Sequence, residues 1–203
     1  MAVVAPKGIT GLAFWDNGFR VFTCNKPIHR PSDLKGQKVR IQSSKVAEAQ
    51  MRGIGAMPQV LAFGEVYNSL MTGVVDCQEN PATNIYTQKF YEVQKHLAVT
   101  NHAYHGYVVI VNKKFWDGLP PDIRSALDNV MKNTTAYYYD QAKEEDRMAM
   151  EGIKKAGKTE IYTPNPQEIA EWKQSFTKVH KEMEGRYGKE MALRRLTTVK
   201  RDD

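Results

Sequence analysis

Two arginines, a phenylalanine and an asparagine are spaced along the first half of the chain, where strands or loops are expected to end. Arg20 lies 20 positions before Arg40, and Phe63 and Asn80 follow Arg40 by 23 and 40 positions. A guanidinium group can hold a carboxylate through two parallel N–H donors, and an amide can add a further hydrogen bond. An aromatic ring would supply an apolar wall beside them. These residue types predict a pocket for an organic anion.

The hydrophobic pattern predicts the strands and helices that must position these residues. Residues 18–24 and 38–42 alternate apolar and polar side chains and are predicted to be strands. Ser43 and Ser44 are candidate N-caps of a helix at 45–52. The alternation of short strands with helices indicates an α/β fold. Further strands are predicted at 59–63, 74–77, 97–101, 107–111 and 160–162, and further helices at 65–71, 82–88 and 165–187.

Two of the predicted elements have distinctive features. Residues 107–111 are apolar enough to form a strand that is buried on both faces. An apolar face also continues over a very long helix at about 122–156, which begins after paired prolines and ends at Gly157. At 1.5 Å per residue this helix would span roughly 50 Å. A helix of that length is expected to lie against more than one small domain.

Composition places the chain among ordinary globular proteins and disfavours a nucleic-acid partner. The 203 residues are 41% hydrophobic and 26% charged, which suits one large domain or one domain with fragments of another. The net charge is +6, but basic and acidic residues are mixed, as at 143–147, and basic residues concentrate only in the tail at 188–203. No apolar run approaches the roughly 18 residues of a membrane helix.

The histidines and the acidic residues form no recognisable metal-binding or catalytic pattern. His102 and His105 are three positions apart, which places them on opposite faces of a strand, and no nearby carboxylate completes a metal site. Asp76 and Glu79 lack a nucleophile beside them. The chain also lacks a Gly-x-Ser-x-Gly turn, a phosphate-binding glycine loop and an HExxH helix. We therefore expect no metal, no cofactor and no enzymatic activity.

The two cysteines, Cys24 and Cys77, leave two interpretations open. A disulfide is allowed in an oxidising compartment, but two distant thiols do not define a disulfide framework. The simpler expectation is two small, buried side chains.

Five stretches, in order and with fixed spacing, resemble the solute-binding proteins of TRAP transporters, the DctP-like family. The resemblance covers about residues 12–187 and implies a type II-like periplasmic-binding-protein fold, in which two α/β lobes close on the ligand and a long helix braces both. It also implies capture of an organic acid, a mono- or dicarboxylate, in the periplasm for a sodium-coupled TRAP permease. The matching stretches are 14–20, 34–40, 62–67, 73–81 and 108–121.

The resemblance assigns roles to individual residues. Arg40 would form the principal salt bridge to the ligand carboxylate, and Asn80 would donate a hydrogen bond to the same group. Arg20 would add a second cationic contact, and Phe63 would pack on the ligand. Trp15 and Gln42 would be wall residues. Cys77 departs from the family pattern, because glycine is common at that position.

The length of the chain implies that only part of this architecture is present. Family members have about 300 residues, within the range where chains divide into domains. By the resemblance, residues 18–105 and 146–187 form the second lobe, whereas 1–17 and 106–145 belong to a mostly missing first lobe and its hinge. A secretion signal would lie outside the chain. The alternative is a truncated, non-binding α/β remnant that forms a homo-oligomer through its exposed first-lobe face.

Overall fold

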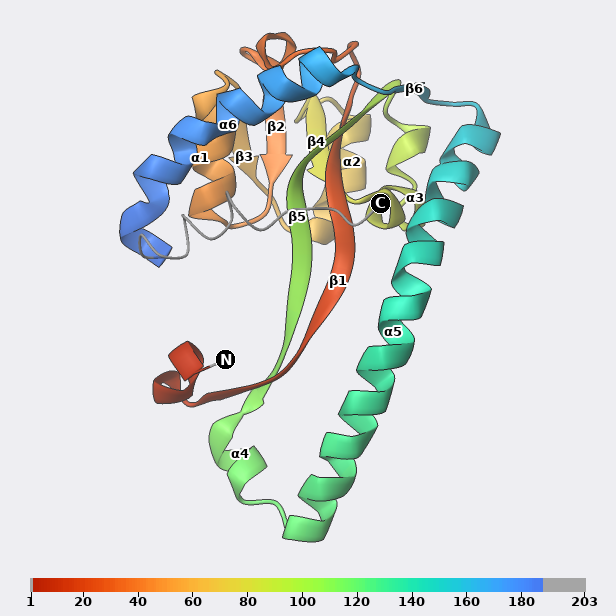
Figure 1. Cartoon of the computed structure of the whole chain (residues 1–203). Coiled ribbons are helices and arrows are strands. Elements are labelled where there is room, and N and C mark those ends of the chain that lie inside the picture. Colours follow the sequence, from red (N-terminus) through yellow and green to blue (C-terminus); the bar gives the residue numbers. More distant parts are fainter. Residues whose placement is uncertain (1, 188–203) are drawn as a thin grey trace.

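Six strands form one mixed sheet, which carries most of the predicted site residues (Figure 1). The computed structural model describes residues 2–187, and the predicted basic tail at 188–203 lies outside them. The sheet order is β3-β2-β4-β1-β5-β6. The strands are β1 (Ile9–Cys24), β2 (Lys38–Ile41), β3 (Met57–Val60), β4 (Cys77–Asn80), β5 (His96–Asn112) and β6 (Glu160–Tyr162).

The sheet combines parallel and antiparallel pairs. Strand β2 runs parallel to β3 and β4, and β5 runs parallel to β6. Strand β1 runs antiparallel to β4 on one side and to β5 on the other. Strands β2, β4 and β1 are therefore neighbours, although they are far apart in the sequence.

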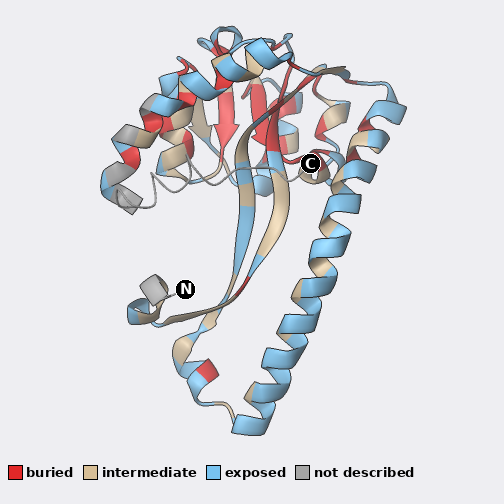
Figure 2. Cartoon of the chain, in the orientation of Figure 1, coloured by how far each residue is buried: buried red, intermediate tan, exposed pale blue. Residues whose placement is uncertain are grey.

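Helices cover both faces of the sheet. Trp172 and Phe176 of α6 pack with Met51 of α1 on one face, and Ile85 and Ile153 pack in a second cluster on the other face. Adjacent strand residues alternate between these layers, as expected for a pleated strand, and the buried residues gather in this part of the molecule (Figure 2). The helices are α1 (Lys45–Gly53), α2 (Val66–Met71), α3 (Ala82–Thr87), α4 (Lys113–Asp117), α5 (Pro121–Ala156) and α6 (Pro166–Tyr187), and the 3₁₀ turns are η1 (Ala2–Lys7), η2 (Pro31–Leu34), η3 (Phe63–Glu65) and η4 (Phe90–Glu92).

Strands β1 and β5 extend beyond the layered core as a two-stranded ribbon (Figure 1). The predicted burial of residues 107–111 on both faces is wrong, because Tyr107, Val108 and Ile110 are exposed. Among the described residues, this segment of β5 has β1 as its strand partner, and α5 runs along the ribbon without burying these side chains. Phe14 of β1 is exposed in the same ribbon. The segment is apolar, but it lies in a two-stranded ribbon and not inside a covered sheet.

The long helix is confirmed, and it lies beside the ribbon. Helix α5 has 36 residues. Tyr138 and Tyr139 donate hydroxyl hydrogen bonds to the backbone carbonyls of Asp16 and Phe14. These contacts attach the middle of α5 to β1, and the end of α5 reaches the layered core through Ile153.

Several predicted strand boundaries are shifted: β1 begins at Ile9 instead of residue 18, and the strands predicted at 97–101 and 107–111 are one strand, β5. Strand β3 ends at Val60, so Phe63 lies in the 3₁₀ turn η3 instead of a strand. Strand β4 contains Cys77–Asn80 instead of 74–77, and all four of its residues are buried. The apolar residues Val74 and Val75 favoured a strand at 74–77. In the structure, the polar residues that follow form the strand, because they pair with β1 on one side and with β2 on the other.

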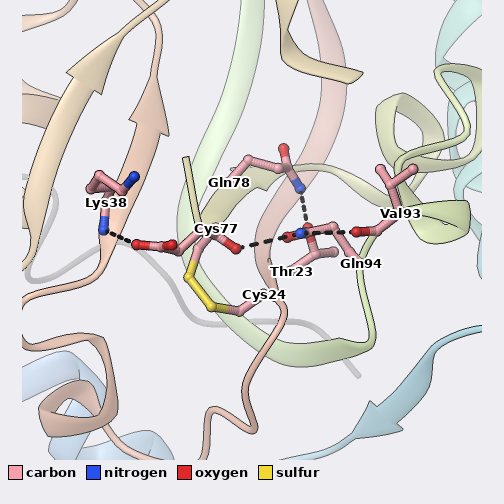
Figure 3. Close-up of a disulfide and its surroundings, with 8 residues drawn as sticks. Thr23, Cys24, Lys38, Cys77, Gln78, Val93 and Gln94 are labelled. Carbon is pink, nitrogen blue, oxygen red and sulfur yellow. Dashed lines mark hydrogen bonds between the residues drawn. A yellow bond between two sulfur atoms is a disulfide. The ribbon is translucent and has the colours of Figure 1, made fainter. Parts of the chain in front are cut away.

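The expectation of two separate thiols is wrong, because Cys24 and Cys77 form a disulfide (Figure 3). Both residues are fully buried, as expected. They lie directly opposite each other in the antiparallel β1–β4 pair, with Cα atoms 4.1 Å apart. This pairing brings together cysteines that are 53 positions apart, which their spacing alone does not indicate.

Candidate ligand-binding site

The adjacency of β2, β4 and β1 brings Arg40, Asn80 and Arg20 into one region. Arg40 lies opposite Gln78 in the β2–β4 pair, and Val21, next to Arg20, lies opposite Asn80 in the β4–β1 pair. Arg20, Arg40 and Asn80 are all buried, with 7%, 3% and 3% of their surface exposed. Buried polar side chains require hydrogen-bond partners, so their contacts indicate which groups can still bind a ligand.

Arg40 is anchored by a backbone carbonyl. Its Nε and Nη2 donate hydrogen bonds of 3.1 and 2.8 Å to the carbonyl oxygen of Leu61. Burial lowers the pKa of Arg40 from its ordinary value, and the positive charge of Arg20 lowers it further, whereas Glu79 acts in the opposite direction. No carboxylate of the described residues forms an ion pair with this guanidinium. Arg40 therefore has no ion-pair partner of its own among the described residues.

Arg20 is held in place by two acceptors. Its Nη1 donates to Oε1 of Glu79 in a buried ion pair and to Oε1 of Gln42 at 3.0 Å. Gln42 follows the end of β2, and Glu79 lies in the middle of β4. These contacts fix the guanidinium of Arg20 between the two strands.

Two histidines approach this ion pair, and the sequence did not suggest this contact. Nε2 of His102 lies 3.5 Å from Oε2 of Glu79 and has no hydrogen-bond partner within residues 2–187, whereas its Nδ1 contacts the hydroxyl of Thr100 at 2.7 Å. The ring also stacks on Phe22. Burial lowers the pKa of His102, and burial lowers the pKa of His105 to about 4. Both rings are therefore neutral at pH 7.

The charges of this group do not balance. Arg20 and Arg40 contribute two positive charges, Glu79 contributes one negative charge, and the histidines contribute none at pH 7. A buried charge is costly unless an opposite charge compensates it. One further anion beside Arg40 would balance the charges of this group.

Phe63 lies beside the guanidinium of Arg40, and the amide of Asn80 is held by two neighbouring amides. The Cζ of Arg40 is 5.7 Å from the centroid of the Phe63 ring, and Phe63 is 40% exposed. Asn80 donates to Oε1 of Gln78 at 2.7 Å and accepts from Nδ2 of Asn84 at 3.0 Å. One N–H of the Asn80 amide remains after these two contacts.

Trp15 is not part of this cluster. It lies on the ribbon, where its Nε1 donates to the hydroxyl of Thr135 at 3.1 Å. Its ring stacks on Tyr138 with centroids 4.8 Å apart. These contacts attach β1 to α5, so Trp15 is a packing residue of the ribbon in this structure.

Sequence reasoning missed Glu79 as the counter-ion of Arg20. The available signal was a run of polar residues, Gln78, Glu79 and Asn80, beside a predicted buried strand. Polar residues in a fully buried strand are uncommon unless they bind one another or a ligand.

Two general features of the described part of the chain bear on the type of site. Within residues 2–187, no three His, Cys, Asp or Glu side chains gather as ligands for a metal ion. In the same part of the chain, no helix combines the length and apolar character that crossing a membrane requires.

Comparison with known proteins identifies similar sequences along nearly the whole chain. Residues 2–186 match the family described as bacterial extracellular solute-binding protein, family 7 (DctP). The C4-dicarboxylate-binding periplasmic protein DctP of Rhodobacter capsulatus is 55% identical over 190 residues, which are 94% of this chain and 57% of that protein. The C4-dicarboxylate-binding protein DctB of Bacillus subtilis is 37% identical, over 96% of this chain and 55% of that protein. The chain therefore spans little more than half the length of these relatives.

Solved structures share the fold. A TRAP periplasmic solute-binding protein from Shewanella oneidensis with bound succinate superposes with a TM-score of 0.91 at 35% identity, over 93% of this chain and 62% of that one. A TRAP periplasmic solute-binding protein from Pseudomonas aeruginosa PAO1 with bound L-malate superposes with a TM-score of 0.85 at 31% identity, over 88% and 62%. This chain has the mixed α/β fold of TRAP periplasmic solute-binding proteins.

Proposed function

Because the chain belongs to the bacterial extracellular solute-binding proteins of family 7, the DctP family, we propose that it binds a small organic acid for a TRAP transporter. Arg40 forms the salt bridge to a ligand carboxylate, and Asn80 donates its remaining N–H to the same group. Arg20 contributes positive potential, Gln42 lines the site beside it, and Phe63 packs against the carbon chain of the ligand.

The lack of an ion-pair partner for Arg40 among the described residues is the observation that carries this proposal. The site has two buried guanidinium groups and one buried carboxylate, Glu79, which is already bonded to Arg20. A ligand carboxylate would supply the missing negative charge and could accept two parallel hydrogen bonds. A neutral sugar or a cation would not satisfy this requirement.

The ligand class that we favour is a C4-dicarboxylate. The 55%-identical relative is a C4-dicarboxylate-binding protein, and two structures with the same fold contain succinate and L-malate. One carboxylate of such a ligand would bind Arg40 and Asn80. The other carboxylate would extend away from these residues.

The same relatives support a cellular location and a membrane partner for this function. They are periplasmic proteins by name, and a buried disulfide is typical of proteins that fold in an oxidising compartment. The chain would act outside the inner membrane and deliver its ligand to TRAP permease subunits, in sodium-coupled uptake. This function is transport and requires no catalytic group.

Calorimetric titration with succinate and L-malate tests the proposal, with butyrate as a monocarboxylate comparison. Replacing Arg40 by Ala is expected to weaken binding by about 2–5 kcal/mol, because the salt bridge is desolvated. Arg52→Ala is the matched control, since Arg52 is exposed and pairs with Glu48 on α1. Unchanged binding by the Arg40→Ala protein would defeat the assignment of the salt bridge.

The second candidate is a non-binding α/β protein that associates through its apolar ribbon. It is favoured by the exposure of apolar side chains on β1 and β5, such as Phe14 and Ile110, which are 56% and 55% exposed. Large exposed apolar patches usually mark an interaction surface. This candidate predicts no thermal shift with any organic acid and a mass above that of one chain in light scattering.

A further inference from the structure

A continuous line of side-chain hydrogen bonds runs through Asn80. Gln78 donates from Nε2 to the hydroxyl of Thr23 at 2.9 Å, and that hydroxyl donates to Oε1 of Gln94 at 3.1 Å (Figure 3). On the other side, Asn17 donates from Nδ2 to Oδ1 of Asn84 at 3.2 Å, and Asn84 donates to Asn80. We call this line the amide network; its members are Asn17, Asn84, Asn80, Gln78, Thr23 and Gln94.

Every hydrogen bond in the amide network points in the same direction. Nε2 of Gln94 donates to the backbone carbonyl oxygens of Asp76 at 3.4 Å and Val93 at 3.3 Å. Backbone carbonyls can only accept, so they determine which end of the Gln94 amide faces Thr23. Thr23 must then donate to Gln94 and accept from Gln78. The direction set at Gln94 is therefore passed on to Asn80.

The direction matters because an asparagine amide has two unlike ends. With its present orientation, Asn80 directs Oδ1 to Asn84 and one N–H to Gln78, which leaves the second N–H as a donor. A reversed amide would face the N–H of Asn84 with another N–H, and the carbonyl of Gln78 with another carbonyl. In a buried position both contacts would leave polar groups unsatisfied.

We propose that Thr23, Gln78 and Gln94 are positioning residues that hold the Asn80 amide as a donor toward the ligand carboxylate. The proposal rests on the proposed function, because Asn80 is the ligand contact through which the network acts. Thr23 and Gln78 are 0% exposed and Gln94 is 1% exposed, so water cannot replace their contacts. The arrangement makes the site selective for an acceptor, such as a carboxylate oxygen, at this position.

Thr23→Val removes the hydroxyl with little change of shape and interrupts the amide network. We expect the dissociation constant for succinate to rise about five- to tenfold, as for the loss of one buried hydrogen bond. Thr23→Ser retains the hydroxyl and is expected to restore binding. Thr159→Val is the matched control, because Thr159 is also buried and donates to the backbone carbonyls of Tyr91 and Gln94. It is expected to lower the melting temperature without changing the affinity.

A double-mutant cycle separates positioning from a general loss of structure. If Thr23 acts through Asn80, Thr23→Val should change the affinity by less than twofold in an Asn80→Ala background. The same fold-change in both backgrounds, or no change in either, would overturn the proposal.

A measurement without ligand separates this proposal from the proposed function. In the wild-type protein, the side-chain amide protons of Asn80 and Gln78 should exchange with solvent far more slowly than those of the exposed Asn129. In Thr23→Val the Asn80 side-chain signals should shift, and in Thr159→Val they should not. Exchange at Asn80 as fast as at Asn129 would refute the network, even if succinate binds. Protected Asn80 protons together with no binding of any acid would instead refute the proposed function.

Discussion

At the scale of single residues, the site combines two buried guanidinium groups, Arg20 and Arg40, with one buried carboxylate, Glu79. Glu79 accepts from Arg20 and lies near His102, whereas the acceptor of Arg40 in the described part of the chain is the backbone carbonyl of Leu61. Burying such a group costs free energy. It includes Arg20 and Arg40, which the family resemblance assigns to the ligand. We therefore expect that removing the positive charge of Arg40 weakens ligand binding, whereas removing the negative charge of Glu79 destabilises the fold.

Replacing Glu79 by Gln should strongly destabilise the protein while preserving its shape. The change leaves two buried guanidinium groups without a carboxylate, and breaking a buried ion pair in this way costs about 3–5 kcal/mol. Urea unfolding without ligand measures the loss. Glu48→Gln is the control, because Glu48 pairs with Lys45 and Arg52 at the surface and should have little effect. An unfolding midpoint for Glu79→Gln equal to that of the control would contradict the role of Glu79.

The histidines predict that acid destabilises the fold. Burial lowers the pKa of His105 to about 4 from an ordinary value of 6.5, with Arg20 adding to the shift and Glu79 opposing it. Between about pH 6.5 and 4 the unfolded chain binds a proton that the folded chain does not, so stability falls as the pH falls through this window. Burial of His102 acts in the same direction.

Melting temperatures of the wild type and of His105→Gln, measured from pH 7.5 to pH 4, test this dependence. The variant should lose less stability than the wild type on acidification, because glutamine does not titrate. Asp146 titrates with the opposite sign, since burial raises its pKa, but it is present in both proteins and its contribution is common to both curves. Parallel curves would show that His105 makes no contribution.

At the scale of elements, the disulfide joins two strands of the site, β1 with Arg20 and β4 with Glu79 and Asn80. Cys24 lies four positions after Arg20, and Cys77 lies three positions before Asn80. The closed loop contains Arg40, Gln42 and Phe63, and Arg20 and Asn80 lie three or four positions outside it. A cross-link at this position restricts the unfolded chain and maintains the register of β1 and β4.

Replacing both Cys24 and Cys77 by Ala should lower the free energy of unfolding by about 4 kcal/mol, because the bond closes a loop of 53 residues. Urea unfolding of the oxidised wild type and of the double variant measures the difference. Reduced wild-type protein is a second comparison and should resemble the variant. If the double variant unfolds at the wild-type urea concentration, the disulfide does not stabilise the fold.

At the scale of the whole molecule, a layered α/β core continues into an exposed ribbon and a long helix (Figure 2). The two main core clusters draw on residues 21–98 and 153–176, which lie inside the segments predicted to form the second lobe. The division into lobes itself stays a prediction. The ribbon and much of α5 present apolar side chains to solvent, including Phe14, Val108 and Val130.

This surface predicts that charge on the ribbon reduces association. Replacing Val108 and Ile110 by Lys should leave the melting temperature nearly unchanged, because both side chains are about half exposed. Size-exclusion chromatography with light scattering should show a smaller mass for the variant at high protein concentration. A wild-type protein that elutes as a monomer at every concentration would exclude association through the ribbon.

Local pattern and the resemblance predicted a large part of this molecule correctly. The periodic apolar face located α5 within one residue of its start, and the α/β fold and the family are confirmed. The strand at 38–42 and the helix at 45–52 were also found. These features depend on residues that are close together in the sequence, so the sequence contains their signal.

The remaining features depend on which strands become neighbours. The disulfide, the Arg20–Glu79 ion pair, the proximity of His102 and the separation of Trp15 from the cluster all join residues that are distant in sequence. The burial of the polar strand β4 and the exposure of the apolar segment 107–111 likewise reverse what composition suggests. By itself the sequence determined most of the elements, the family and the residue types that could hold a carboxylate. Only the tertiary structure decided which charges are compensated and which donor of Asn80 is left, because burial and hydrogen-bond direction are properties of packed neighbours.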